Sequence, residues 1–228
     1  MQQLRHDPRT IALLLVVPSA LVGLLAWSLV NRPGNFDALG PRLLGVFSLT
    51  VMFLVTSVTT LRERTNGTLE RLLTMPLAKA ELILGYAGAF GVVAIVQSAL
   101  VSTLSYSWYG LAHQGIPWRI SAVALCAGLL GTAFGLALSA LAKTEFQAVQ
   151  FMPAFILPQL LLCGLMVPVA QLPTGMRNVA DVLPMTAAVH AITPAQTTSY
   201  YAEQFAVMVA YIVVALIAGS TTLRRRTK

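Results

Sequence analysis

Six long apolar runs constrain this sequence more than any other feature. An α-helix needs roughly 20 apolar residues to cross a bilayer core about 30 Å thick, and each run is about that long. Of the 228 residues, 57% are hydrophobic and 10% are charged, which leaves little for a soluble domain. We therefore predict one all-α integral membrane domain, residues 1–228, with six transmembrane helices. The spans are expected at about 11–30, 42–61, 82–109, 120–142, 146–167 and 204–223.

The basic residues divide unevenly between the segments that join these runs. The net charge is +7, and Lys and Arg lie in short clusters beside the apolar runs. One set of segments, with both chain ends, holds Arg5, Arg9, Arg62, Arg64, Arg71, Lys79, Lys143, Arg224, Arg225, Arg226 and Lys228. The other set holds Arg32, Arg42, Arg119 and Arg177. Because cytoplasmic segments are the more basic ones, we predict that both termini are cytoplasmic. Such clusters suit anionic membrane lipids, and we predict no nucleic-acid partner.

Two further segments are expected at the membrane surface. Residues 1–9, MQQLRHDPR, are polar, and they fit either a short interfacial helix that leads into the first span or a frayed terminus. Residues 167–201 are too apolar for a free loop, and prolines divide them into pieces too short to span. These prolines are Pro168, Pro173, Pro184 and Pro194. We predict a re-entrant segment in the outer leaflet before the sixth span.

Small and amide side chains mark the third, fourth and fifth runs. Gly128, Gly131 and Gly135, at spacings of three and four residues, form a smooth helix face, which predicts close helix packing. The amides are Gln97, Gln147, Gln150 and Gln159. Amides in lipid are costly unless they face protein or a wet cavity. The four glutamines therefore fit a translocation path or interhelical hydrogen bonds, and both interpretations remain open.

Several kinds of chemistry have no pattern in this sequence. We find no G-x-x-x-x-G-K-[ST], H-E-x-x-H or G-x-S-x-G motif, and Cys126 and Cys163 lie inside apolar runs without metal-ligand spacing. We predict no catalytic residue, no metal site and no ATPase site in this chain. His190 fits either a substrate contact near the outer face or a packing role. No acid maps to mid-membrane, which argues against proton coupling; an ion-coupled secondary transporter or a channel without an ATPase remains the alternative.

The most polar long internal segment, residues 62–82, contains a short amphipathic pattern. Asn66-Gly67 is a turn dipeptide, after which Leu69, Leu72 and Leu73 recur at helical spacing until Pro76. This predicts a helix of about two turns, too short to be stable alone in water. It must rest on the membrane, on the flanking spans or in a cleft of another protein. A solvated loop that only sets topology is the alternative.

This segment resembles a known pattern. The sequence LRERTNGTLERLLTMPLAKAELILGY is similar to the R-E-R-x-x-G-T-L-E-R-L-L-x-x-P-L loop between the second and third spans of type-2 ATP-binding-cassette exporter permeases. The stretch LPQLLLCGLMVPVAQLPTGMRNVADVLPMTAAVHAI resembles the same family's G-x-x-x-P-x-x-x-x-P…P block. The resemblance implies that the loop is a coupling helix seated in a separate nucleotide-binding subunit. The matching residues are Glu63, Arg64, Gly67, Thr68, Leu69, Glu70, Arg71, Leu72 and Leu73.

The resemblance also implies a function and partners. The chain would be the permease subunit of an exporter in a bacterial inner membrane, paired with a second permease copy or a paralogue. The partner ATPase would bind ATP and Mg²⁺, and this chain would bind no cofactor. Apolar spans without an extracellular domain favour a hydrophobic or amphipathic substrate, such as a drug, an antibiotic or a lipid-like molecule.

Overall fold

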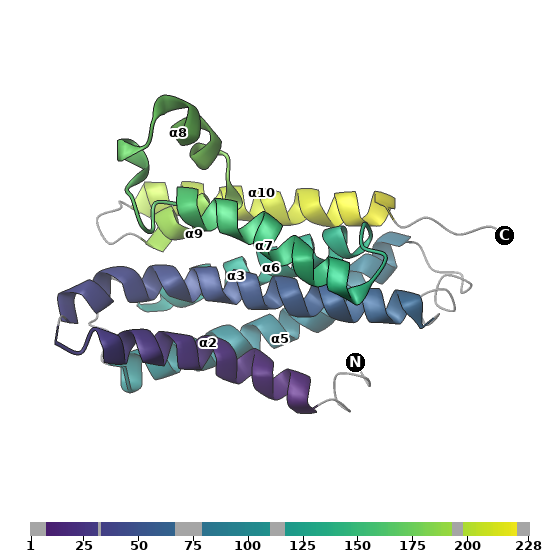
Figure 1. The fold of residues 1–228 in the computed structure, drawn as a ribbon, viewed down its shortest axis with the longest axis horizontal. Coiled ribbons are helices and arrows are strands. Elements are labelled where there is room, and N and C mark those ends of the chain that lie inside the picture. The colour runs from purple at the N-terminus through teal and green to yellow at the C-terminus, as the bar shows by residue number, and fades with distance from the viewer. Residues whose placement is uncertain (1–7, 32, 67–78, 110–116, 193–197, 223–228) are drawn as a thin grey trace.

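A bundle of long helices forms most of the protein (Figure 1). The computed structural model describes residues 8–31, 33–66, 79–109, 117–192 and 198–222, and all regular elements within them are helical. The long helices are α2 (Pro8–Ser28), α3 (Pro33–Thr65), α5 (Lys79–Ser107), α6 (Pro117–Ser139), α7 (Glu145–Leu162) and α10 (Thr198–Thr222). The short helices are η1 (Val169–Gln171), α8 (Thr174–Asp181) and α9 (Pro184–Ile192). The predicted all-α fold is confirmed for these residues.

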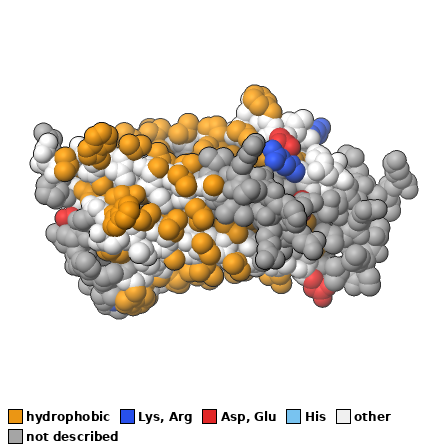
Figure 2. All heavy atoms as spheres, turned by 90° about the horizontal axis from the view of Figure 1, so that it is seen from below, with side chains coloured by type: hydrophobic (Ala, Val, Ile, Leu, Met, Phe, Trp, Pro, Cys, Tyr) orange, Lys and Arg blue, Asp and Glu red, His pale blue; other side chains and the backbone are white. Residues whose placement is uncertain are grey.

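Four of the described helices are long and apolar enough to cross a membrane. They correspond to Gly34–Thr65, Glu81–Ser107, Trp118–Ser139 and Tyr200–Thr221. Helices α2 and α7 lie in the same bundle (Figure 1). On the face drawn in Figure 2, hydrophobic side chains cover the middle of the bundle, and the charged side chains lie toward its ends. The chain is therefore a multi-pass membrane protein.

Helix α6 is packed against α3 through its glycines. An ideal Cβ on Gly131 would lie 2.2 Å from the carbonyl oxygen of Leu49, and one on Gly135 would lie 2.7 Å from that of Phe53. Gly128 lies between α5 and α3, where a Cβ would lie 3.3 Å from the Cβ of Ala94 and 3.6 Å from Cγ of Met52. Two of the three glycines thus mark the closest approach of α6 to α3, where only a missing side chain lets the backbones meet.

Helix α3 begins earlier than the sequence indicates. The second span was expected to begin at about residue 42, whereas the helix itself already begins at Pro33. A proline suits the first helical position, where its missing N–H has no partner to lose. Phe36 is 4% exposed and belongs to a buried cluster with Val22 and Leu44. This packing outweighs the weak helix propensity of Gly34 and its neighbours.

The segment before α10 is folded into short helices. Helix α7 ends at Leu162, before the predicted end of the fifth span at Val167, because Gly164 has φ +84° and so leaves the helical conformation. Prolines lie where the next elements begin: Pro168 precedes η1, Pro173 precedes α8 and Pro184 opens α9. Helix α9 is almost wholly buried and contacts α10, α3 and α6.

The start of α2 and the end of α10 lie toward the same end of the bundle. Figure 1 shows α2 beginning and α10 ending toward the end of the bundle at which α3 also ends. That both termini are cytoplasmic stays a prediction. Residues 1–7, where most of the interfacial helix was expected, lie outside the described part.

Candidate functional site

The predicted coupling segment is described at its base. Glu63 and Arg64 lie in the last turn of α3, which continues past the expected end at Leu61 to Thr65. The backbone N–H of Asn66 donates to the carbonyl of Arg62 at 2.9 Å. The remaining predicted residues, Gly67, Thr68, Leu69, Glu70, Arg71, Leu72 and Leu73, lie outside the described residues.

Three consecutive charged residues at this base contact three different helices. Arg62 Nε lies 2.9 Å from Glu145 Oε1, in the first turn of α7. The carboxylate of Glu63 accepts a hydrogen bond from the hydroxyl of Tyr86, on α5. Arg64 Nη1 donates to the carbonyl oxygen of Ser139, the last residue of α6, at 2.6 Å. Successive helical side chains point about 100° apart, so one turn of α3 reaches α5, α6 and α7.

These contacts differ in strength. Arg62 and Glu145 are about half exposed, and such ion pairs contribute about 0–1 kcal/mol. Arg64 binds one of the last carbonyls of α6, which has no partner within its own helix. A cation there also interacts favourably with the helix dipole. The Arg64 contact is therefore the firmer of the two arginine contacts, and it fixes the end of α3 to the end of α6.

The turn between α6 and α7 is itself ordered by Gln147. Thr144 caps α7, because its side chain accepts from the backbone N–H of Gln147 at 3.2 Å. In return, Gln147 Oε1 accepts from the backbone N–H of Lys143 at 2.9 Å. This reciprocal pattern is close to a capping box. Gln147 thus lies in the first turn of α7, at the same end of the bundle as Arg64.

The other glutamines predicted for a translocation path lie apart from one another. Gln150 is exposed on α7. Gln159 is 2% exposed; its Nε2 donates to Phe155 O at 3.1 Å and its Oε1 accepts from Met185 N at 3.3 Å. Gln97 is fully buried in α5, and its amide has no hydrogen-bond partner among the described residues. The structure does not bring the four together, and their role in transport stays a prediction.

Sequence reasoning missed the partners of the charged turn. Tyr86, Ser139 and Glu145 lie on different helices and far from Arg62 in sequence, and no local pattern connects them. The described contacts of Arg62, Glu63 and Arg64 join this turn to the bundle, and the contact of the Glu63 motif with another subunit stays a prediction. The base of the loop is therefore attached firmly to the bundle before any partner is considered.

Comparison with known proteins decides the family. The profile of the ABC-2 type transporter family matches residues 1–197. The chain belongs to this family. The matched residues of this ABC-2 permease include the charged turn of α3 and the short helices η1, α8 and α9.

Individual relatives agree with this assignment. The chain is 30% identical over 145 residues to the "Probable multidrug ABC transporter permease YbhR" of Escherichia coli K12, covering 64% of this chain and 39% of that protein. It is 28% identical to the "Linearmycin resistance permease protein LnrN" of Bacillus subtilis 168, over 59% of this chain and 35% of that protein. It is 22% identical to the "ABC transporter G family member 20" of Dictyostelium discoideum, over 78% of this chain and 24% of that protein. The matches thus span less than half the length of each of these relatives.

Proposed function

We propose that this chain is the transmembrane subunit of an ATP-driven exporter, powered by a separate nucleotide-binding subunit. The observation that carries the proposal is the charged turn Arg62–Arg64, which joins the base of the loop to α5, α6 and α7. A displacement of the loop would be transmitted to three helices rather than absorbed by a flexible hinge. The ATPase would bind ATP and Mg²⁺, and this chain would bind no cofactor of its own.

The proposed arrangement has six spans, formed by α2, α3, α5, α6, α7 and α10. Both termini and the loop after α3 would be cytoplasmic, in a bacterial inner membrane. The common end shared by the start of α2 and the end of α10 supports this arrangement, as does the excess of basic residues in the same segments. The assembly would contain two permease chains, either two copies of this one or this chain with a paralogue.

A hydrophobic or amphipathic substrate, such as a drug, an antibiotic or a lipid-like molecule, is the proposed cargo. Two relatives are named as permeases for multidrug transport and linearmycin resistance. Within the described residues, each helix long enough to span contains a strongly apolar stretch, and no group of three or more His, Cys, Asp or Glu could hold a metal ion. These features suit the movement of an apolar molecule rather than the binding of an ion.

The test compares how well the ATPase co-purifies with the wild-type chain and with a Leu72→Asp variant. Leu72 belongs to the apolar pattern of the loop, so an aspartate there would place a charge in the docking contact, where an unpaired charge is costly. We expect wild-type protein to retain a Walker-motif ATPase and to support ATP-driven export from membrane vesicles, and Leu72→Asp to lose both.

The matched control is Thr74→Asp, which adds the same charge outside the Leu69, Leu72 and Leu73 pattern. It should retain the ATPase. Normal export by a well-expressed Leu72→Asp protein would contradict the docking role. Transport without ATP by the wild type would instead favour an ion-coupled transporter or a channel.

A further inference from the structure

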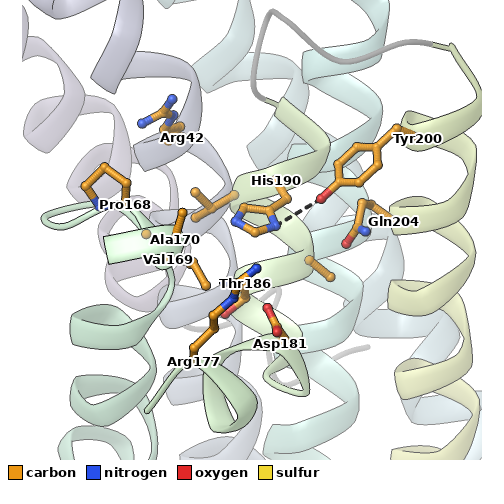
Figure 3. A pocket seen from close by; sticks show the side chains of 13 residues that line it. Arg42, Pro168, Val169, Ala170, Arg177, Asp181, Thr186, His190, Tyr200 and Gln204 are labelled. Carbon is orange, nitrogen blue, oxygen red and sulfur yellow. Dashed lines mark hydrogen bonds between the residues drawn. The ribbon is translucent and has the colours of Figure 1, made fainter. Parts of the chain in front are cut away.

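A cavity of about 560 Å³, drawn in Figure 3, is lined by residues of α3, α8, α9 and α10. Arg42 contributes to it from α3, Arg177 and Asp181 from α8, His190 from α9, and Tyr200 from α10. Arg42 precedes Arg62 by about five and a half helical turns, so at 1.5 Å per residue the two arginines are about 30 Å apart along α3. This is about the thickness of a bilayer core. In the proposed topology the cavity is on the outer side.

Polar groups line this cavity. The hydroxyl of Tyr200 and Nδ1 of His190 are 3.2 Å apart and share a hydrogen bond. Burial lowers the pKa of His190, an effect that Asp181 opposes and Arg42 reinforces, which favours the neutral ring. Figure 3 shows the His190 ring at the centre of the group, between Arg42 on one side and Asp181 on the other. Charge in the cavity therefore comes from Arg42, Arg177 and Asp181, with a positive excess.

Arg42 brings a buried donor to this cavity. Its Nε is buried and has no hydrogen-bond partner among the described residues. A buried charged donor without an acceptor is costly, because its lost hydration is not replaced. An anionic oxygen placed in the cavity would supply that acceptor through a charge-assisted hydrogen bond. Arg177, exposed on α8, lines the same cavity and adds a second cation.

The wall of the cavity is held in place by hydrogen bonds from neighbouring helices. Tyr211 of α10 donates to the carbonyl of Val182, between α8 and α9. Gln159 of α7 accepts from the backbone N–H of Met185, near the start of α9. At Gly164, with φ +84°, an added Cβ would lie 3.0 Å from Val169 Cγ2 and 3.7 Å from His190 Nε2. The glycine therefore lets the chain turn tightly beside His190.

Apolar side chains flank the polar cavity. Met166 is 70% exposed, just before the cavity residue Pro168, and Val182 is 63% exposed, directly after Asp181. Val179, on α8 between Arg177 and Asp181, is 49% exposed. An amphipathic molecule could place its head in the cavity while its tail covers these side chains, since burial of apolar surface contributes roughly 25 cal/mol per Å².

We propose that this cavity binds the phosphate or carboxylate head of an anionic amphiphile, with Arg42 and Arg177 as its cationic contacts. The molecule is either a membrane lipid or, if the proposed function holds, a transported substrate that pauses at the outer end. The binding itself requires neither ATP nor the ATPase subunit. A failure of the coupling experiment would therefore leave this proposal testable by itself.

The test is equilibrium binding to the full chain in detergent, measured by calorimetry. The probes are dioctanoyl phosphatidic acid, dioctanoylglycerol with the same tails but no charge, and inorganic phosphate with no tails. We expect phosphatidic acid to bind at least tenfold more tightly than either of the others. Equal affinity for dioctanoylglycerol would overturn the role of the charge, and equal affinity for phosphate would overturn the role of the tails.

Variants at the cavity should shift the affinity in opposite directions. Arg42→Gln should weaken phosphatidic acid binding about tenfold or more, and Asp181→Asn should strengthen it by removing a repulsive charge. Arg177→Gln, at an exposed position that should not affect folding, should weaken it as well. Lys143→Gln removes the same charge from an exposed position at the other end and is the matched control. Unchanged affinity in both Arg42→Gln and Arg177→Gln would overturn the site.

A third measurement distinguishes lipid from substrate. In vesicles that carry the ATPase, ATP-driven export should fall in Arg42→Gln if the occupant is cargo. If export is unchanged while phosphatidic acid binding is lost, the occupant is a resident lipid. Both outcomes support an anionic amphiphile site; loss of export with phosphatidic acid binding intact would contradict it.

Discussion

Gly131 lies against the backbone of α3, with no space for a side chain. Because an added Cβ would meet Leu49 O at 2.2 Å, and a backbone atom cannot move aside cheaply, Gly131→Ala should force α6 away from α3. Overpacking of this kind costs about 1–3 kcal/mol. We expect a decrease in Tm of about 2–12 °C, on a scale of about 2–4 °C per kcal/mol, measured by fluorescence-detected unfolding in detergent.

The matched control at the residue scale is Gly88→Ala. Gly88 is exposed on α5, and an added Cβ would meet nothing within 4 Å. Because alanine favours a helix over glycine by up to about 1 kcal/mol, the Tm of this variant should be unchanged or higher. Equal Tm values for the two variants would mean that α6 does not approach α3 as closely as the structure has it.

At the scale of elements, the Arg62–Glu145 pair joins the end of α3 to the start of α7. The single variant Arg62→Glu should place two carboxylates together and separate these ends, because like charges repel. The pair is half exposed, so stability should change by no more than about 1 kcal/mol. ATP-driven transport should nevertheless fall several-fold, because less of the movement of the loop would be transmitted to α7.

Restoration of the pair tests whether the contact, rather than the residue, matters. Adding Glu145→Arg to Arg62→Glu reverses the pair and should recover most of the transport rate. The rates are measured in vesicles with equal amounts of assembled transporter, so that differences in expression between the variants do not affect the comparison. A double variant as inactive as Arg62→Glu alone would indicate that Arg62 acts through another contact.

Elements also show what the sequence alone could predict. The apolar runs predicted α3, α5, α6 and α10, because a long apolar helix is visible in local composition. The start of α3 was missed, because Phe36 gains its burial from residues distant in sequence. The contact from Arg64 to Ser139 joins residues 75 positions apart, and the cavity around His190 combines several elements. Such pairings depend on packing between helices, and one sequence does not record them.

At the scale of the whole molecule, the proposed topology places α8 outside the cell and the turn between α6 and α7 inside. Both natural cysteines, Cys126 and Cys163, are buried, so a cysteine introduced at the surface can be labelled selectively. Gly175→Cys lies on exposed α8 with nothing within 4 Å of its Cβ, and Lys143→Cys lies in the exposed turn.

A membrane-impermeant maleimide added to intact cells should label Gly175→Cys and should label Lys143→Cys only after the cells are opened. The reason is the distribution of charge: the end of the bundle near Lys143 also carries Arg62 and Arg64, and basic segments stay in the cytoplasm. The unmodified protein, with its buried cysteines, serves as the control and should remain unlabelled. Labelling of Lys143→Cys in intact cells, with Gly175→Cys protected, would invert the topology. It would then place the cavity around Arg42 in the cytoplasm and the charged turn of α3 outside, beyond the reach of any ATPase.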